Sequence, residues 1–587
     1  MKNLLDILSE KLGEAFEKAG YDRNLGRATI SNRPDLCEYQ CNGAMAGAKQ
    51  YKCAPIVIAQ AVADLLKEDE AFSEIAAVNP GFINIKIKDE FLSKHIEAMA
   101  GDEKLGVEPS DGKTAVIDYG GANVAKPLHV GHLRSAIIGE TIKRLKRFKG
   151  DTVIGDVHLG DWGLQMGLII EQLRCEQPDL VYFDESFMGE YPDTPPFTLS
   201  ELEQIYPKAS ARSKEDEDFK EKAQTATLEM QKGKRGYRAI WKHILDVSIP
   251  DLKKNYDNMK VEFELWKGES SAEEFIAPMV EDMINNGYAH ESQGAIVVDV
   301  KEESDQKEIP PCIIKKSDGA SLYATSDLAT IIQRKKDYNP DEIIYVADKR
   351  QEMHFTQVFR TAKKTKIVDD SIDFSFLGFG TMNGRDGKPF KTRDGGVMRL
   401  ETLISDINKA VYDKMMENRE MDEAEALEIS KTVGLSALKY GDLSNQASKD
   451  YVFDLERFTS FEGDTGPYIL YTIVRIKAIL RKYEETGKST KGLALNRTLT
   501  PAEKQLMLEL SKFSSMIDAA YCELAPHKIC AYIYDLANVF NSFYHENKIM
   551  TEEDADKQAG FIALLLIAKK ALEISIEILG FDAPDRM

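Results

Sequence analysis

The sequence is poor in cysteine and has no long apolar run, and each absence excludes a class of protein. Seven cysteines, an odd number among 587 residues, argue against a disulfide-stabilised scaffold. Cys37, Cys41 and Cys53 cluster without a nearby fourth metal ligand, so isolated thiols are favoured over a zinc site. The longest apolar run, residues 561–568, is much shorter than the roughly 20 residues that span a bilayer. It predicts a buried helix segment instead.

A targeting segment and an overall basic charge are also missing. Residues 1–10 lack the uninterrupted apolar stretch of a secretory signal, so we expect a cytoplasmic protein without a membrane partner. The chain has 76 basic and 98 acidic residues, which give a net charge of -22. Because phosphate contacts need a basic footprint, a nucleic acid could bind only at a local basic face. Candidate stretches, each of which also fits a solvated face, are 143–149, 232–238 and 475–482.

The length of the chain predicts three or four domains, and the hydrophobic periodicity changes along it. Residues 114–154 follow the order strand, glycine-containing loop, helix and strand, which is typical of a βαβ unit in a parallel nucleotide-binding sheet. Strand-like runs at 295–299 and 342–347 indicate that this sheet resumes after an acidic insertion. We predict a multidomain α/β protein with a Rossmann-type parallel-sheet core, an N-terminal α+β domain and a C-terminal all-α bundle. The predicted boundaries are 1–110, 111–400 with an insertion at about 175–290, 401–454 as a helical connector, and 455–587.

Two histidines and a glycine stand between the first predicted strand of this sheet and its helix. In Asn123-Val-Ala-Lys-Pro-Leu-His129-Val-Gly-His132 the histidines are three residues apart, so they share one face of the helix start. A metal pair would need a third ligand, which the local sequence does not offer. Alternatively the histidines donate to phosphate, Gly131 lets the backbone approach it, and the helix N-terminus adds positive potential. We favour phosphate binding, with Lys126 as an auxiliary donor.

This segment resembles the HIGH signature of class I aminoacyl-tRNA synthetases, and its surroundings resemble one family, the arginyl-tRNA synthetases. The resemblance implies an enzyme that ligates L-arginine to tRNA(Arg) through an arginyl-adenylate, with consumption of ATP and release of pyrophosphate and AMP. It extends over nearly the whole chain and rests on further stretches: His158-Leu-Gly-Asp-Trp-Gly-Leu-Gln165, Tyr323-Ala-Thr-Ser-Asp327, Arg350-Gln-Glu-Met-His-Phe355, Phe461-Glu-Gly-Asp-Thr-Gly-Pro-Tyr468 and Ala583-Pro-Asp-Arg-Met587.

The second class I signature, KMSKS, is altered in this chain. Its place is taken by Gly387-Lys388-Pro-Phe-Lys391-Thr-Arg-Asp-Gly-Gly396, which keeps two lysines. The resemblance implies a clamp on the departing pyrophosphate, whereas the residues alone also fit an exposed turn. Gly487-Lys488-Ser489 ends like a P-loop, but the earlier glycine and a preceding buried strand are missing. A Gly-x-Ser-x-Gly elbow is absent too, which removes one common hydrolase class.

The resemblance assigns residues to each small substrate. A guanidinium group has five donors in a planar fork, and therefore needs carboxylate or carbonyl acceptors. Asp327 alone would also fit a helix N-cap before Leu328. Magnesium is expected to arrive with ATP, without a protein-held metal. The catalytic residues implied are His129, His132, Lys126, Lys388 and Lys391; for ATP, Gly131 and Gly160 join the histidines and Lys388 and Lys391; for L-arginine, Asp118, Asn123, Tyr323, Asp327 and Gln351.

For tRNA the resemblance implies two surfaces on one chain, which we expect to be a monomer. Asn79, Phe82 and Asn84 would contact the D-loop, because an aromatic ring flanked by amides suits an unpaired base. Tyr468 and Tyr544 would lie on the anticodon surface of the last helices, although core packing also fits any single tyrosine.

Two alternatives from other classes stay open. One is a class I synthetase for another amino acid, or a small-molecule adenylate-forming enzyme, because the HIGH helix alone does not identify the substrate. The predicted C-terminal bundle argues against the small-molecule enzyme. The other is a catalytically silent relative that binds RNA or acts as a scaffold, against which the intact His129, His132, Lys388 and Lys391 argue.

Overall fold

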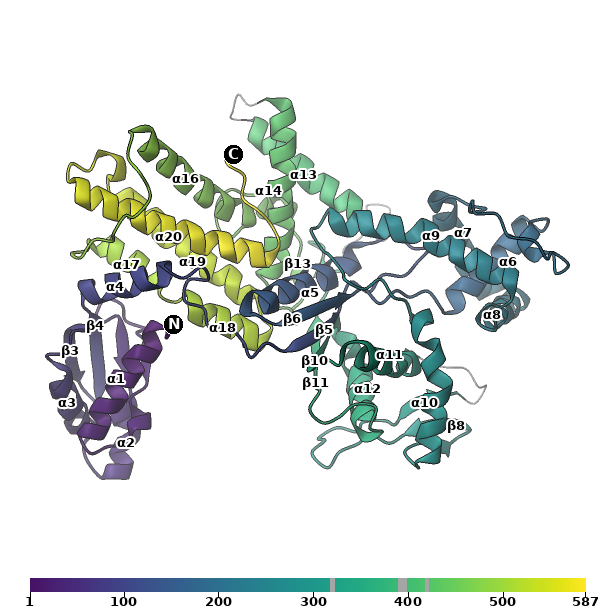
Figure 1. The fold of residues 1–587 in the computed structure, drawn as a ribbon, viewed down its shortest axis with the longest axis horizontal. Helices are drawn as coiled ribbons and strands as arrows, with labels where there is room; N and C mark the ends of the chain where they lie inside the picture. The colour runs from purple at the N-terminus through teal and green to yellow at the C-terminus, as the bar shows by residue number, and fades with distance from the viewer. Residues whose placement is uncertain (317–322, 389–397, 418–421) are drawn as a thin grey trace. The chain divides into compact units, whose positions relative to one another are not determined.

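The computed structural model describes residues 1–316, 323–388, 398–417 and 422–587 (Figure 1). The chain divides into two compact units. The terminal unit contains residues 1–109, 460–577 and 582–587, and the central unit contains residues 110–459 and 578–581. The division into two compact units does not test the four domain boundaries predicted from the sequence. Those boundaries therefore stay a prediction.

The first part of the terminal unit is a four-stranded antiparallel sheet with helices. The strands, in spatial order, are β1 (Ala28–Ile30), β2 (Tyr39–Cys41), β4 (Phe82–Ile87) and β3 (Phe72–Val78); the helices are α1 (Leu4–Lys18), η1 (Arg23–Leu25), α2 (Gly43–Tyr51), α3 (Pro55–Leu66) and α4 (Asp89–Ala100). Along β4 the side chains of Ile83 and Ile85 are buried, while Phe82 and Asn84 point to the opposite face. The alternation of apolar and more polar residues along 82–87 thus gives β4 one buried and one partly exposed face.

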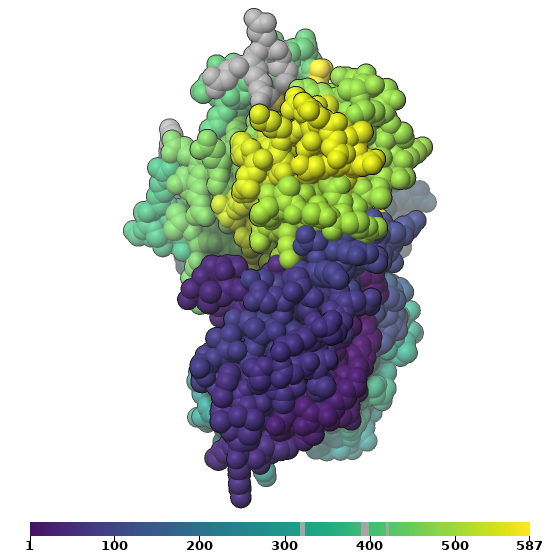
Figure 2. Space-filling view, turned by 90° about the vertical axis from the view of Figure 1, so that its left-hand side faces the viewer, coloured from purple at the N-terminus to yellow at the C-terminus, as the bar shows by residue number. Residues whose placement is uncertain are grey.

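The rest of the terminal unit is a helical bundle, and Figure 2 shows its green and yellow surface against the purple N-terminal part. Ser93 of α4 donates to the backbone carbonyl of Asn496 at 2.6 Å and joins the two parts. The apolar run 561–568 is buried within a helix, as predicted. In the described part of the chain, no helix is long and apolar enough to cross a bilayer. The bundle consists of α16 (Gly466–Glu485), α17 (Pro501–Leu510), α18 (Phe513–Glu523), α19 (Pro526–Glu546), η5 (Ile549–Thr551) and α20 (Ala555–Leu579).

The central unit is built on a parallel sheet, which confirms the Rossmann-type prediction. Its spatial order is β11 (Asp373–Phe379), β10 (Glu342–Asp348), β5 (Thr114–Asp118) and β6 (Thr152–Asp156). The helix α5 (Val130–Lys149) joins β5 to β6 and completes the predicted βαβ unit. Gly150 ends α5 with a φ of 107°. Residues other than glycine rarely adopt this backbone conformation. Glycine at this position therefore explains why the helix ends sharply.

Helices and a second sheet complete the central unit. The prediction that residues 295–299 rejoin the parallel sheet is wrong, because β8 (Ala295–Val298) pairs antiparallel with β7 (His290–Ser292) and β9 (Cys312–Lys315). An apolar alternating run predicts a strand, but tertiary contacts choose its partner. The remaining elements are α6 (Leu164–Glu176), η2 (Val181–Phe183), α7 (Leu199–Glu215), α8 (Glu217–Gln231), α9 (Arg235–Asp257), η3 (Glu269–Ala272), α10 (Glu273–Asn285), β7 (His290–Ser292), β8 (Ala295–Val298), β9 (Cys312–Lys315), α11 (Tyr323–Tyr338), η4 (Lys349–Gln351), α12 (Glu352–Lys364), β12 (Met382–Asn383), α13 (Leu400–Met416), α14 (Glu423–Leu443), β13 (Tyr451–Val452) and α15 (Leu455–Phe458).

The lysines of the basic stretch 143–149 are buried inside the protein. Lys143 is only 1% exposed and lies 3.0 Å from a carboxylate oxygen of Glu140. Lys146 pairs with Glu342 at 2.7 Å and is buried too. A buried charge needs a partner inside the protein, and here the partners are carboxylates of the same unit. These lysines therefore stabilise the packing of α5 and cannot present a basic face to phosphate.

Candidate active site

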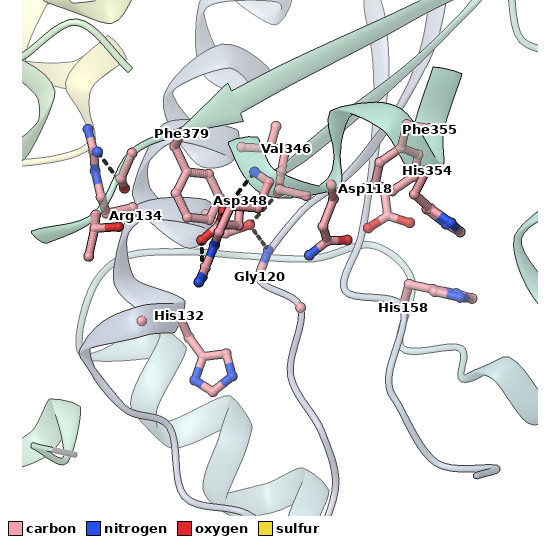
Figure 3. A pocket seen from close by; sticks show the side chains of 18 of the residues that line it. Asp118, Gly120, His132, Arg134, His158, Val346, Asp348, His354, Phe355 and Phe379 are labelled. Carbon is pink, nitrogen blue, oxygen red and sulfur yellow. Dashed lines mark hydrogen bonds and ion pairs between the residues drawn. The ribbon is translucent and has the colours of Figure 1, made fainter. Parts of the chain in front are cut away.

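The carboxyl ends of the parallel strands border a cavity of about 650 Å³ (Figure 3). Its lining comes from the ends of β5, β10 and β11, the start of α5, and the first turns of α11 and α12. In open α/β sheets, the crevice outside the carboxyl ends of the strands is where ligands bind. The fold therefore places a ligand site beside the segment with the two histidines.

His129 and His132 lie together at one side of this cavity. His129 caps α5, and its Nδ1 accepts a hydrogen bond from the backbone N–H of Gly131 at 3.0 Å. Nδ1 of His132 accepts from the backbone N–H of His129 at 3.2 Å, and the ring centroids are 4.0 Å apart. With Nδ1 accepting, the proton of each neutral ring is assigned to Nε2. The helix start thus holds two imidazoles in a fixed tautomer.

Both imidazoles are neutral at physiological pH. Burial lowers the pKa of His132 to about 3, and the neighbouring His129 and Lys126 lower it further in the same direction. The pKa of His129 is also lowered, chiefly by burial. The pair can therefore donate Nε2–H hydrogen bonds from a helix N-terminus without carrying a charge of its own.

Another side of the cavity gathers carboxylates. Oδ2 of Asp118 accepts from Arg334 at 2.6 Å, and this guanidinium, itself buried, also pairs with Asp156 at 2.7 Å. Oδ2 of Asp327 lies 2.5 Å from Nε2 of His354. In both carboxylates one oxygen is held by the protein, and Oδ1 has no partner among the described residues. Figure 3 shows Asp118 and His354 on the side away from His132.

Glu269 is one of the cavity-lining residues that the sequence did not reveal. It lines the cavity, and its carboxylate has no hydrogen-bond or ion-pair partner within the described ranges. Burial raises the pKa of Glu269 to about 7; His158 opposes this shift, while Asp161 and Asp327 add to it. Its backbone N–H donates to the carbonyl of Leu159, which brings η3 to the sheet. No local motif marks this residue, because a long-range pairing alone places it in the cavity.

The structure brings some of the other predicted residues to the cavity and leaves others outside its lining. Gly131, Tyr323 and Gln351 line it, and Tyr323 is 75% exposed. Asp327 lies in the second turn of α11, so the alternative of a helix N-cap is wrong. Lysine 391 lies outside the described residues. The predicted residues that do not line the cavity are Asn123, Lys126, Gly160 and Lys388.

Asn123 and Gly160 nevertheless lie side by side. They form a parallel β-bridge, and a Cβ at Gly160 would collide with the side chain of Asn123. Glycine is thus required for this close approach. Lys126 lies with Nζ 4.7 Å from the centroid of the Tyr206 ring. Lys388 is exposed, and its backbone N–H donates to Asp386 at 3.1 Å.

In the terminal unit the predicted tRNA-binding residues fall on two surfaces. Phe82 and Asn84 share the solvent side of β4, where Oδ1 of Asn84 accepts from Gln40 at 2.8 Å. Asn79 is exposed just before this strand. On α16, the hydroxyl of Tyr468 donates to Asn538 at 2.8 Å.

The basic stretch 475–482 is divided between two roles. The guanidinium of Arg475 lies 5.4 Å from the ring centroid of Tyr544 and so joins the aromatic surface. Lys477 and Arg481 instead hold the backbone carbonyls of residues 583–585. Tyr532 of α19, in the same bundle, is 5% exposed and lies in the core. The surface is therefore smaller than the sequence indicates.

Two structural findings bear on metals and thiols. All seven cysteines are free. Within the described ranges, no group of three His, Cys, Asp or Glu side chains is placed to hold a metal ion.

Three family models match the chain. They are the catalytic domain of class I (R) tRNA synthetases over residues 95–455, the arginyl tRNA synthetase N-terminal domain over 2–87, and the DALR anticodon binding domain over 469–587. The parallel sheet, the histidine pair at α5 and the catalytic-domain match define a class I aminoacyl-tRNA synthetase. The arginine--tRNA ligases of Agathobacter rectalis and Alkaliphilus oremlandii are 60% and 55% identical to this chain. Each match covers the whole of this chain and the whole of the relative. The chain belongs to the arginyl-tRNA synthetase family.

Solved structures agree at the level of the fold. The arginyl-tRNA synthetases of Plasmodium falciparum and Thermus thermophilus superpose with TM-scores of 0.82 and 0.77, at 23% and 20% identity, and each match covers both chains completely. The predicted fold class, with a Rossmann-type catalytic core between an N-terminal α+β domain and a C-terminal all-α bundle, is confirmed.

Proposed function

We infer that the protein ligates L-arginine to tRNA(Arg) in two ATP-dependent steps. The carboxylate of arginine attacks the α-phosphorus of ATP and gives arginyl-adenylate and pyrophosphate. A terminal ribose hydroxyl of the tRNA then takes the arginyl group, and AMP leaves. Membership of the family supports this reaction. The observation that carries it is one cavity with neutral imidazole donors on one side and carboxylates on another.

At the phosphate side, His129 and His132 donate through Nε2–H to ATP as negative charge develops. Donors fixed by backbone hydrogen bonds before the reaction are the ones that stabilise a transition state most. Gly131 keeps the helix start open to the nucleotide, and Gly160 is a further ATP contact. Lys388 and Lys391 hold the departing pyrophosphate, and Lys126 is an auxiliary donor.

Magnesium, in this proposal, accompanies ATP. Mg²⁺ gives up its water reluctantly and is usually shared with substrate phosphates rather than enclosed by protein ligands. It would neutralise part of the phosphate charge while bound to the nucleotide. The protein residues themselves orient the nucleotide and donate to it.

At the acidic side, Asp118, Asp327 and Glu269 accept the guanidinium group, and Tyr323 lies beside them. Two of these carboxylates each offer one oxygen, since Arg334 and His354 hold the other. A planar fork of donors fits acceptors that come from several directions. A lysine ammonium could not reach them all at once. Asn123 and Gln351 hold the amino-acid end of arginine.

The terminal unit binds tRNA through the two surfaces described above. Asn79, Phe82 and Asn84 contact the D-loop, with the ring of Phe82 stacking on an unpaired base. Tyr468 and Tyr544 contribute to the anticodon surface, and the match to an anticodon binding domain over 469–587 supports this assignment. We place the enzyme in the cytoplasm as a monomer; its free thiols suit a reducing compartment.

Amino-acid-dependent exchange of pyrophosphate into ATP tests the function directly. The enzyme is assayed with each proteinogenic amino acid, with and without tRNA(Arg). Exchange should appear with arginine alone and should depend on tRNA, because a partner that binds both ends of the chain can favour one arrangement of the catalytic loops. Exchange with another amino acid would contradict the substrate. Strong exchange in RNA-free enzyme would contradict only the dependence on tRNA.

A further inference from the structure

Helices of the acidic insertion contact the residues just before α5. Oγ of Ser248, on α9, accepts from the backbone N–H of Ala125 at 3.0 Å in a buried position. Ala125 has a φ of 62°, a left-handed conformation that an L residue rarely adopts unless its surroundings impose it. The next residue, Lys126, places its ammonium over the ring of Tyr206 on α7. The insertion therefore orients both the backbone and the side chain of this segment.

The same insertion contacts the residue that precedes α13. Glu203 of α7 accepts from the guanidinium of Arg399 at 2.8 Å. Arg399 itself forms a β-bridge with His129. On either side of this bridge, the N–H of Val130 donates to Met398 at 3.2 Å and that of Leu400 to Leu128 at 3.0 Å. The chain that follows the two predicted phosphate-binding lysines is thus fixed against the histidine pair.

Glu203 and Tyr206 act from one face of one helix. They are three residues apart, which places them in neighbouring turns on the same side of α7. The helix is held rigidly in the protein because its side chains Leu202, Ile205 and Ala209 are buried. A capping box between Thr198 and Glu201 fixes its start. A single well-anchored helix therefore touches both segments that frame the phosphate side.

We propose that α7 of the insertion braces the two phosphate-binding segments, with Glu203 and Tyr206 as positioning residues for adenylate formation. Tyr206 directs the ammonium of Lys126, which its flexible four-carbon stem would otherwise leave unoriented. Glu203 holds Arg399 and thereby fixes the residues that directly precede α13. The proposal rests on the proposed function, because its consequence is the rate of arginine activation. It gives the acidic insertion a role within the central unit.

Substitutions on α7 test the brace through kcat and KM of arginine activation at saturating tRNA. Tyr206→Leu removes the ring face and should lower kcat about three- to tenfold, while the KM for arginine changes little. Tyr206→Phe keeps the ring and should recover most of the loss. Glu203→Gln should lower kcat by a similar or smaller factor. Glu215→Gln, the same change at an exposed position of α7, is the matched control and should retain the normal rate.

A charge exchange and a chemical probe separate this proposal from the proposed function. Glu203→Arg and Arg399→Glu should each impair kcat and partly restore each other when combined, and a double-mutant cycle in thermal unfolding should show coupling. Acylation of Lys126, followed by mass spectrometry, should be several-fold faster in Tyr206→Leu because the amine is freed. Normal kcat in Tyr206→Leu and Glu203→Gln, absent coupling or unchanged acylation would overturn the brace. If the native enzyme does not attach arginine to tRNA, the proposed function is wrong. The coupling between Glu203 and Arg399 and the acylation rate of Lys126 would still show whether α7 positions these residues.

Discussion

The two sides of the cavity are built in different ways. The phosphate side comes from one continuous helix start, where His129 and His132 satisfy their Nδ1 atoms with backbone N–H groups two and three residues away. The acidic side is assembled from β5, η3, α11 and α12, which supply Asp118, Glu269, Asp327 and His354. One side is thus a local structure, and the other depends on the whole central unit.

The two sides also differ in charge, and this predicts different kinetic consequences. Neutral donors on the phosphate side interact most strongly with charge that develops in the transition state, so their loss should lower kcat. In the proposed function, the carboxylates on the acidic side bind a guanidinium that is charged throughout the reaction. Their loss should therefore appear mainly in the KM for arginine. Each prediction below tests this division.

The largest effect is expected at His132. His132→Ala removes an Nε2–H donor and should lower the kcat of arginine activation by about 10²-fold, as loss of a preorganised transition-state donor typically does. The KM for arginine should change little. Single-turnover rates of adenylate formation measure the effect, and circular dichroism checks the fold. His132→Asn, which offers an amide donor of different reach, serves as the conservative comparison. A near-normal rate in His132→Ala would contradict the role of the donor.

The next effect is expected across the cavity, at Asp327. Asp327→Asn replaces a charged acceptor by a neutral one and should raise the KM for arginine roughly tenfold or more. The KM for ATP should stay nearly constant, and lysine should remain a poor substrate because its ammonium cannot form the fork. Steady-state kinetics with arginine and ATP varied in turn measure the two KM values. Equal changes in the two constants would show that Asp327 has only a structural role.

The difference between the sides also explains what the sequence could predict. The histidine pair, the βαβ unit and the strand at 82–87 depend on residues close in sequence, and all three were predictable. Glu269 was not, since only the pairing of η3 with Leu159 brings it to the cavity. The buried ion pairs of Lys143 and Lys146 were missed for the same reason, because their charges alone indicate a solvated face. Local patterns reveal local sites.

A pH dependence is expected from Glu269. Burial raises its pKa to about 7, so the carboxyl is protonated below that pH and ionised above it. A guanidinium ion favours the ionised form, so arginine binding releases a proton, and affinity is lost as the pH falls through about 7. The KM for arginine should be about tenfold higher at pH 6 than at pH 8.

Glu269→Gln is the control for this profile, because it removes the titrating group. The KM for arginine should then be high but nearly independent of pH, while the KM for ATP serves as an internal reference in both proteins. The same pH dependence in the native enzyme and in Glu269→Gln would assign the titration to another group of the cavity.

The smallest effect is expected at His354, and it sharpens the comparison further. Because Nε2 of His354 lies 2.5 Å from Oδ2 of Asp327, the histidine orients a carboxylate that we propose as an acceptor for arginine. His354→Ala should free the rotation of that carboxylate and raise the KM for arginine about threefold, with kcat nearly unchanged. His354→Gln keeps a donor and should recover part of the loss. In Asp327→Asn the further change His354→Ala should have little effect, because the oriented carboxylate is already absent. Additive effects of the two substitutions would show that His354 acts independently of Asp327.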